Sequence, residues 1–211
     1  MLDFTLLHDW YEQFEEGYKP TIIRGELYPD SSKSRYENTD ANTNFRASLT
    51  AGIRKGDYII ASNNNMIYLL DWEVHLETNN APSRALRCNF YLTIQRFTDP
   101  TIDERGYEIE DSGGYKTIVD AIPCNAYRYD GRPEFSASSG TPGITPNAYT
   151  ILNVQYNEQT KLIHVDDRFI WGDDTYEIVD VSRVGLSIDS TSGCLTLRCR
   201  RDTGGLNYAL R

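Results

Sequence analysis

The sequence predicts a mainly β protein with an antiparallel barrel or sandwich core, a short N-terminal α-helix and long loops. Apolar and polar residues alternate along several short segments, which is the pattern of strands with one buried face. Gly, Asn, Asp and Ser separate these segments and favour turns. Fifteen tyrosines, whose apolar rings carry a polar tip, suit strands and wet interfaces. A chain of 211 residues buries enough surface to fold without disulfides or metals.

The N-terminal segment 1–18 has helical rather than alternating spacing. We expect a short amphipathic helix that ends near Gly17 and Pro20. Its apolar face would contain Leu6, Leu7, Trp10, Tyr11, Phe14 and Tyr18. The helix either packs on its own domain or docks on a neighbouring subunit, and both interpretations stay open. For docking, Trp10 and Phe14 are the expected contact residues.

Residues 29–49 are polar and rich in Ser, Asn, Asp and Arg, which indicates a long loop or an extended arm. Loops of this length are uncommon in compact domains and often serve binding. We therefore place a second candidate partner contact at Arg35 and Tyr36.

A first β module is expected over 50–131. Its strands are predicted at 57–61, 66–74 and 86–96, followed by a small hairpin with strands at 107–109 and 115–119. The strand at 86–96 has the clearest alternation: one face would carry Leu86, Cys88, Phe90, Leu92 and Ile94.

Residues 132–149 contain a Ser- and Gly-rich run that is typical of a linker or surface loop. A second β module follows over 150–211, with strands predicted at 150–156, 168–171, 175–182 and 193–201. The chain thus divides into a helix and arm (1–49), a β module (50–131), a linker (132–149) and a β module (150–211). The two modules either fold separately or share one barrel.

The two β modules resemble each other. Residues 56–60, 69–71 and 86–88 occur in the same order, and at similar spacing, as residues 167–171, 178–180 and 197–199. This order indicates an internal duplication. Generic hairpins of a single barrel would give a similar pattern, so both interpretations stay open.

The charge and the cysteines exclude several classes. A net charge of −10 argues against a protein that grips the phosphate backbone, although DNA could pass nearby. No apolar run is long enough to span a bilayer, and no leader peptide is evident, so we expect a non-membrane protein. The spacing of Cys88, Cys124, Cys194 and Cys199 favours free thiols in a reducing cytoplasm.

No catalytic or metal-binding motif is evident, and we expect no enzyme activity and no cofactor. The three histidines lack ligand spacing. Asp166-Asp167 and Asp173-Asp174 flank one short strand and could hold Ca²⁺ or act as acids, but ordinary turn aspartates explain them as well. Arg54 and Lys55 form a small basic cluster that could lie near DNA, and a solvated face is the alternative.

Several short motifs resemble the head-closure (stopper) proteins in the neck of long-tailed bacteriophages. They are Gly56-Asp57-Tyr58-Ile59, Tyr68-Leu69-Leu70-Asp71, Arg87-Cys88-Asn89-Phe90-Tyr91-Leu92, Ile122-Pro123-Cys124, Thr141-Pro142-Gly143 and the run from Phe169 to Ile178. The resemblance extends from about Phe45 to the C-terminus. Ile94 departs from it, because the family pattern leads us to expect Trp there.

The resemblance implies a structural virion protein, made in the host bacterial cytoplasm, without enzymatic activity. Its copies would form a ring, commonly of six, between the portal or adaptor protein and the tail terminator or other tail proteins. The loop with Pro133, Ser138, Gly140 and Pro142 would then be the candidate gate, and Arg54 and Lys55 the candidate channel residues. The alternative is a carbohydrate-binding β module of a tail fibre or baseplate. A weaker alternative is an acid-catalysed hydrolase using Asp167 or Asp174.

Overall fold

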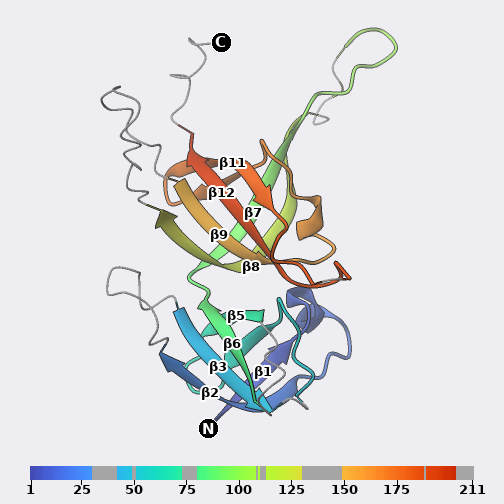
Figure 1. Ribbon diagram of the computed structural model, residues 1–211. Helices are drawn as coiled ribbons and strands as arrows, with labels where there is room; N and C mark the ends of the chain where they lie inside the picture. The colour runs from blue at the N-terminus through green and yellow to red at the C-terminus, as the bar shows by residue number, and fades with distance from the viewer. Residues whose placement is uncertain are drawn as a thin grey trace, which may run out of the picture.

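The computed structural model describes residues 1–29, 42–48, 51–72, 80–107, 109, 113–129, 149–187 and 189–202. These residues form two closed six-stranded antiparallel barrels, placed end to end in Figure 1. The first barrel contains β1 (Leu2–Leu7), β2 (Thr21–Pro29), β3 (Asn42–Ser48), β4 (Tyr58–Ala61), β5 (Ile67–Trp72) and β6 (Asn80–Arg87). The second contains β7 (Phe90–Thr98), β8 (Gly114–Tyr129), β9 (Tyr149–Gln155), β10 (Arg168–Trp171), β11 (Asp174–Ser182) and β12 (Cys194–Arg201). The expected mainly β fold is confirmed.

Both barrels have the same strand order. Around the first barrel the strands run β1-β2-β3-β6-β5-β4, and around the second they run β7-β8-β9-β12-β11-β10. Each strand of the first barrel thus corresponds to the strand six places later in the second. The repeated order fits the duplicated β module that the sequence indicates.

Matching backbone hydrogen bonds align the two repeats residue by residue. Leu70 donates its N–H to the carbonyl oxygen of Asp57 at 2.8 Å, and Ile178 donates to Asp167 at the same distance. The residue before each aspartate has a left-handed φ, 88° at Gly56 and 74° at Asp166. Asp57 therefore corresponds to Asp167.

The same alignment moves the sequence matches out of register, because Asp167 aligns with Asp57 rather than Gly56 and Ile178 with Leu70 rather than Leu69. Ala85 pairs with Leu70 as Cys199 pairs with Ile178. Cys88 and Cys199 consequently lie at different positions of their repeats, although β6 and β12 correspond as strands.

The expected N-terminal α-helix is wrong. Residues 2–7 form strand β1, which pairs with both β2 and β4 and closes the first barrel. Within residues 1–18 only Trp10–Phe14 is helical, and it forms the short 3-10 helix η1. Asp9 caps this helix by accepting the Tyr11 N–H at 2.9 Å. A short isolated helix is marginal, whereas a strand in a closed barrel pairs its backbone on both sides.

The division between the barrels also differs from the sequence-based one. The strands separate between Arg87 and Phe90 rather than at 132–149, and residues 1–29 supply two strands of the first barrel. The single strand expected over 86–96 is therefore the end of β6, a two-residue link and β7. The predicted strands at 150–156, 168–171, 175–182 and 193–201 agree with β9 to β12 within one residue at each end.

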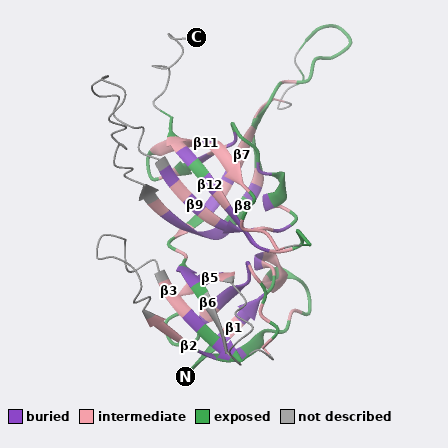
Figure 2. Cartoon of the chain, in the orientation of Figure 1, coloured by how far each residue is buried: buried purple, intermediate pink, exposed green. Residues whose placement is uncertain are grey.

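One apolar core joins the two barrels. Phe4, Ile23, Phe45, Ile59 and Leu70 belong to a separate core inside the first barrel. The larger core fills the second barrel and extends across the junction to the first-barrel residues Leu7, Trp10, Tyr58, Leu69 and Leu86. Figure 2 shows buried residues on both sides of this junction. Because apolar side chains of both barrels leave water together, the barrels stabilise each other.

All four cysteines are free. Cys124, Cys194 and Cys199 are buried, and Cys88 is partly exposed. Burial raises the pKa of each thiol well above its ordinary value, because a thiolate is poorly solvated inside the protein. A raised pKa keeps the thiols protonated, which is typical of cysteines that serve packing.

Candidate functional site

Several buried hydrogen bonds join the two barrels at their junction. The junction is built from the chain after β1, the turn before β4, the end of β9 and the start of β12. Gly56 lies so close to Gly193 that a Cβ added at Gly56 would collide with the Gly193 carbonyl oxygen. Glycine at position 56 thus lets the two barrels approach backbone to backbone.

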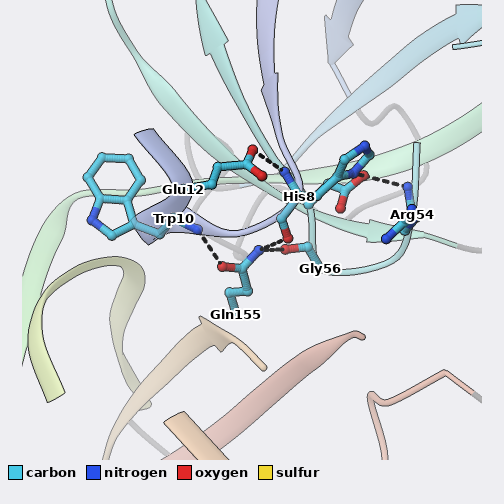
Figure 3. Close-up of polar contacts among 7 residues, drawn as sticks. His8, Trp10, Glu12, Arg54, Gly56 and Gln155 are labelled. Carbon is cyan, nitrogen blue, oxygen red and sulfur yellow. Dashed lines mark hydrogen bonds and ion pairs between the residues drawn. The ribbon is translucent and has the colours of Figure 1, made fainter. Parts of the chain in front are cut away.

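Gln155, at the end of β9, links the second barrel to three backbone groups of the first. Its Oε1 accepts the Trp10 N–H at 2.9 Å. Its Nε2 donates to the carbonyl oxygens of His8 at 3.0 Å and Gly56 at 2.8 Å (Figure 3). The side chain is 2% exposed, so these bonds are protected from water. Gln155 thereby satisfies buried groups that would otherwise be costly.

An aromatic cluster lies beside this clamp. Trp10 packs edge-on against Tyr58 at 5.7 Å between ring centroids and tilted against Tyr91 at 6.1 Å. The fully buried Tyr58 hydroxyl donates to the Pro123 carbonyl oxygen of the second barrel at 2.5 Å. Burial raises the Tyr58 pKa well above its ordinary value, so the hydroxyl stays protonated as this bond requires.

A buried carboxylate completes the junction. Asp57 is 1% exposed, and its Oδ2 accepts the Arg54 N–H at 2.6 Å and lies 3.0 Å from His8 Nδ1. Burial raises the pKa of Asp57 to about 6, although the Arg54 N–H and His8 oppose the shift. The pair borders a cavity of about 180 Å³ whose lining also includes Gln155, Asn157 and Gly193.

The second barrel repeats this pair with arginine in place of histidine. Leu7 faces Tyr58 across β1 and β4 as Gln95 faces Arg168 across β7 and β10. The next residues along, His8 and Arg96, therefore reach the two equivalent aspartates. Arg96 binds Asp167 in a bidentate manner, with Nε–Oδ1 at 2.7 Å and Nη2–Oδ2 at 2.9 Å. Hydrogen bonding to Asp167 raises the pKa of Arg96, so a permanent cation in the second repeat replaces the histidine of the first.

The second candidate site is the β7–β8 arm, which comprises the described residues between Arg96 and Lys116. In Figure 1 this hairpin stands off the second barrel at the upper right, and Figure 2 colours its tip as exposed. Its apolar side chains are exposed: Phe97, Ile102, Tyr107, Ile109 and Tyr115. Phe97 and Tyr115 lie opposite each other and contact edge to face at 5.3 Å. Exposed apolar residues gathered in this way are typical of a protein-binding surface.

A third feature is a shallow depression of about 550 Å³ on the second barrel. Its lining includes Trp171, Tyr176, Asp173, Asp174 and Arg201. The Trp171 ring is held by stacking on Phe90 at 5.1 Å. Asp174 is ion-paired with Arg201, which leaves an aromatic wall beside a partly neutralised polar rim.

Comparison with known proteins identifies the second barrel. Residues 93–200, more than half of the chain, match the family described as the YomX C-terminal domain. The chain belongs to the YomX C-terminal domain family. This family is phage-associated, which makes the protein phage-related and confirms the coarser part of the resemblance. No curated protein and no solved structure matches the chain.

The match to the YomX C-terminal domain begins within β7 and ends within β12. The family domain is thus the second barrel, including the β7–β8 arm and the Trp171 depression. The first barrel lies outside the matched residues, yet it has the same strand order.

The structure places the sequence-predicted contact residues in different surroundings. Trp10 is 6% exposed and occupied by contacts within the chain, whereas Phe14 is 72% exposed. Arg54 donates its backbone N–H to the Asp57 carboxylate, and Lys55 Nζ lies 3.6 Å from Asp71 Oδ1. The remaining predicted residues lie outside the described part of the chain: Arg35, Tyr36, Pro133, Ser138, Gly140 and Pro142. A partner-binding, gating or channel role for these residues stays a prediction.

The paired aspartates of the sequence do not come together. Asp167, just before β10, is bound to Arg96, and Asp174, after the turn that follows β10, is bound to Arg201. The described residues contain no group of three or more His, Cys, Asp and Glu arranged to hold a metal ion. Within the same residues, no helix has the length and apolar character that a membrane span requires.

Sequence reasoning missed the buried pair at the junction between the barrels. His8 and Asp57 are 49 positions apart, and no local motif links them. The β7–β8 arm carried a usable signal, because the acidic, turn-rich segment 99–114 also contains Ile102, Tyr107 and Ile109. Apolar residues in a polar turn have no core to enter and therefore indicate a contact surface.

Proposed function

We propose that the protein is a structural component of the phage neck, in which copies of the chain form a ring between the portal or adaptor and the tail. The observation that carries this proposal is the β7–β8 arm of a phage-associated domain, whose exposed apolar side chains suit docking to another virion protein. The ring would close the DNA-filled head and join it to the tail. It would need no catalysis and no cofactor.

The stiffness of the molecule supports an assembly role. The shared core, the Gln155 clamp and the close approach of Gly56 to Gly193 fix one barrel on the other. A rigid two-barrel unit transmits a docking geometry from one neighbour to the next without losing it in a flexible linker. Binding through pre-organised surfaces also costs less conformational entropy.

The charge supports a position near DNA without tight binding. The chain carries a net charge of −10, and many described basic side chains are already ion-paired with carboxylates of the same chain. A surface of this kind repels phosphates and reduces sticking, as a channel through which DNA slides requires.

Deletion of the gene in the phage or prophage that carries it tests this function. The lysate is imaged by negative-stain electron microscopy, with complementation by the wild-type gene as the control. We expect heads that have lost their DNA beside complete, unattached tails. Intact particles that fail only to adsorb to cells would contradict the neck role.

The Trp171 depression favours a second candidate function, a carbohydrate-binding module of a tail fibre or baseplate. Aromatic rings with nearby carboxylates and a guanidinium provide stacking and hydrogen bonds to a sugar. This function predicts that the purified protein binds a host cell-wall glycan and that Trp171→Ala abolishes the binding. Absence of binding to any cell-wall fraction would remove this candidate.

A further inference from the structure

We propose that the β7–β8 arm inserts into an apolar cleft, bordered by basic residues, on a different protein of the virion. This inference rests on the proposed function in assuming an assembly role, and it adds the chemistry of the partner. It assigns the docking surface to described residues of the second barrel that lie outside the inter-barrel junction.

The arm is built to present its side chains in one geometry. The β7 and β8 strands pair up to Thr98 and Gly114. Beyond them, the Asp103 carboxylate accepts the N–H groups of Arg105 at 2.9 Å and Tyr107 at 2.8 Å, and the Asp103 N–H bonds the Tyr107 carbonyl oxygen. Ile109 donates its N–H to Thr101 at 2.8 Å, which ties the two sides of the turn together. A turn held by its own backbone loses little entropy on binding.

The apolar side chains of the arm have no place in the barrel core. Ile102 is 63% and Tyr107 69% exposed, and both lie beyond the last paired residues of the hairpin. Phe97 and Tyr115, within the paired part of the hairpin, are also exposed and contact each other, and the Arg168 guanidinium covers the Tyr115 ring. Tyrosine, together with large apolar residues, is the composition that contributes most to protein interfaces.

The charge around these side chains selects the partner. From 99 to 111 the sequence holds six carboxylates (Asp99, Asp103, Glu104, Glu108, Glu110 and Asp111) and one arginine, Arg105. A segment of this net charge that also exposes Ile102 and Tyr107 favours a cleft lined by Lys and Arg, and it disfavours an acidic protein surface or an anionic lipid surface.

A second copy of this chain fits that requirement poorly. The chain as a whole is acidic, with a net charge of −10, and seven of its described cations are already ion-paired within it. The pairs are Arg24–Asp3, Lys55–Asp71, Arg96–Asp167, Lys161–Glu158, Arg198–Asp180, Arg200–Glu177 and Arg201–Asp174. The net negative charge of a second copy opposes docking of the acidic arm, and at these seven cations docking would also break existing pairs. The observations therefore favour a different, locally basic protein as the occupant.

Site-specific cross-linking in assembled particles tests the inference. The Tyr107→Cys protein is purified, its thiol is labelled with a short photoreactive probe, and the labelled protein is added to particles assembled without the chain before irradiation. The cross-linked peptides are then identified by mass spectrometry. Val184→Cys is the matched control, because Val184 is 91% exposed on the same barrel but lies outside the arm. We expect Tyr107→Cys to cross-link to another virion protein at a peptide rich in Lys, Arg and apolar residues, and Val184→Cys not to do so.

Two variants test the chemistry of the contact. Ile102→Ser removes an apolar contact at the tip, and Glu104→Lys reverses a rim charge; each should lower incorporation into particles by about tenfold while the purified protein stays folded. Cross-links from Tyr107→Cys to a second copy of this chain, or normal incorporation of both variants, would overturn the inference. A partner found at the tail tip rather than the neck would support the docking inference and refute the neck assignment, so the two proposals fail separately.

Discussion

At the scale of single residues, Asp57 and Asp167 occupy equivalent backbone positions, just before β4 and β10, but each is paired with a different side chain. Asp167 has a bidentate arginine, whereas Asp57 has a histidine 3.0 Å away and is more poorly compensated for its burial. Asp57, at the junction between the barrels, is therefore the aspartate whose pKa is raised. Groups facing Asp57 and His8 from the packed elements include the Arg54 backbone, Lys55, Glu12 and Asp9.

Asp57 makes stability depend on pH. Its pKa is about 6 in the folded protein against an ordinary 3.8, so the folded state binds this proton more tightly than the unfolded state. The contribution is fully present below about pH 4 and is lost as pH rises through 6, with a magnitude of up to about 3 kcal/mol. We expect Asp57→Asn to remove this part of the pH dependence.

The measurement is urea denaturation at pH values from 4 to 7.5 for the wild type and Asp57→Asn. Glu104→Gln, a change at an exposed carboxylate, is the control and should follow the wild-type profile. Parallel profiles for the wild type and Asp57→Asn would show that Asp57 does not titrate in this range.

Gln155 is the residue whose loss should cost most at the junction. Gln155→Ala leaves the Trp10 N–H and the His8 and Gly56 carbonyl oxygens without partners in a buried place. We expect the free energy of unfolding to fall by about 3 kcal/mol, since each buried unsatisfied group costs about 1–3 kcal/mol and water will reach some of them. Glu158→Ala, at an exposed position on the same cavity, should change it by less than about 0.5 kcal/mol. Equal effects of the two substitutions in equilibrium denaturation would refute the clamp.

At the scale of the elements, sequence reasoning succeeded where burial follows local alternation and failed where it does not. Strands β9 to β12 were predicted nearly to their ends, because Leu195, Leu197 and Cys199 alternate toward a single core. The N-terminal segment misled because Leu6 enters the core of the first barrel while Leu7 and Trp10 enter the shared core. Because these residues enter two separate cores, the spacing of the apolar residues along the segment resembles that of an amphipathic helix.

The strand expected over 86–96 failed for a related reason. Leu86 and Leu92 both face the shared core, one from each barrel, so the alternation continues across the link between the barrels. Nothing local distinguishes one long strand from two short ones that contribute to one core. The pairing of His8 with Asp57 and the clamp of Gln155 were equally invisible, because each joins residues that only the barrel topology brings together.

The repeat of the buried pair gives a prediction at the same scale. Arg96→Ala removes the guanidinium that binds Asp167, which is 1% exposed. The Arg96 side chain is partly exposed, so the cost at neutral pH is reduced to about 2 kcal/mol rather than the larger value of a fully buried pair. His8→Ala should cost less, because Asp57 can take up a proton. Thermal unfolding at pH 7 checks the order, and an equal or larger loss for His8→Ala would contradict the different compensation of the two pairs.

At the scale of the whole molecule, the shared core predicts that both barrels unfold together. Trp10 reports on the junction and Trp171 on the second barrel, so fluorescence and circular dichroism should give one coincident transition for the wild type. Two barrels joined only by a linker would instead unfold in two steps.

Gly56→Ala is the variant that separates these possibilities. The change strains a left-handed residue, with φ of 88°, and also drives a methyl group into the backbone of Gly193 across the junction. Gly172→Ala is the matched control, because Gly172 has a φ of 64° but open space around its Cβ position. Backbone strain alone should cost about 1 kcal/mol in both variants, and the collision adds a further loss only in Gly56→Ala. We expect Gly172→Ala to keep one transition at a slightly lower midpoint, and Gly56→Ala to lower the midpoint by more and to split it. Equal losses with a single transition in both variants would mean that the contact at Gly56 does not couple the barrels, and the stiffness that supports an assembly role would then have to come from the shared apolar core alone.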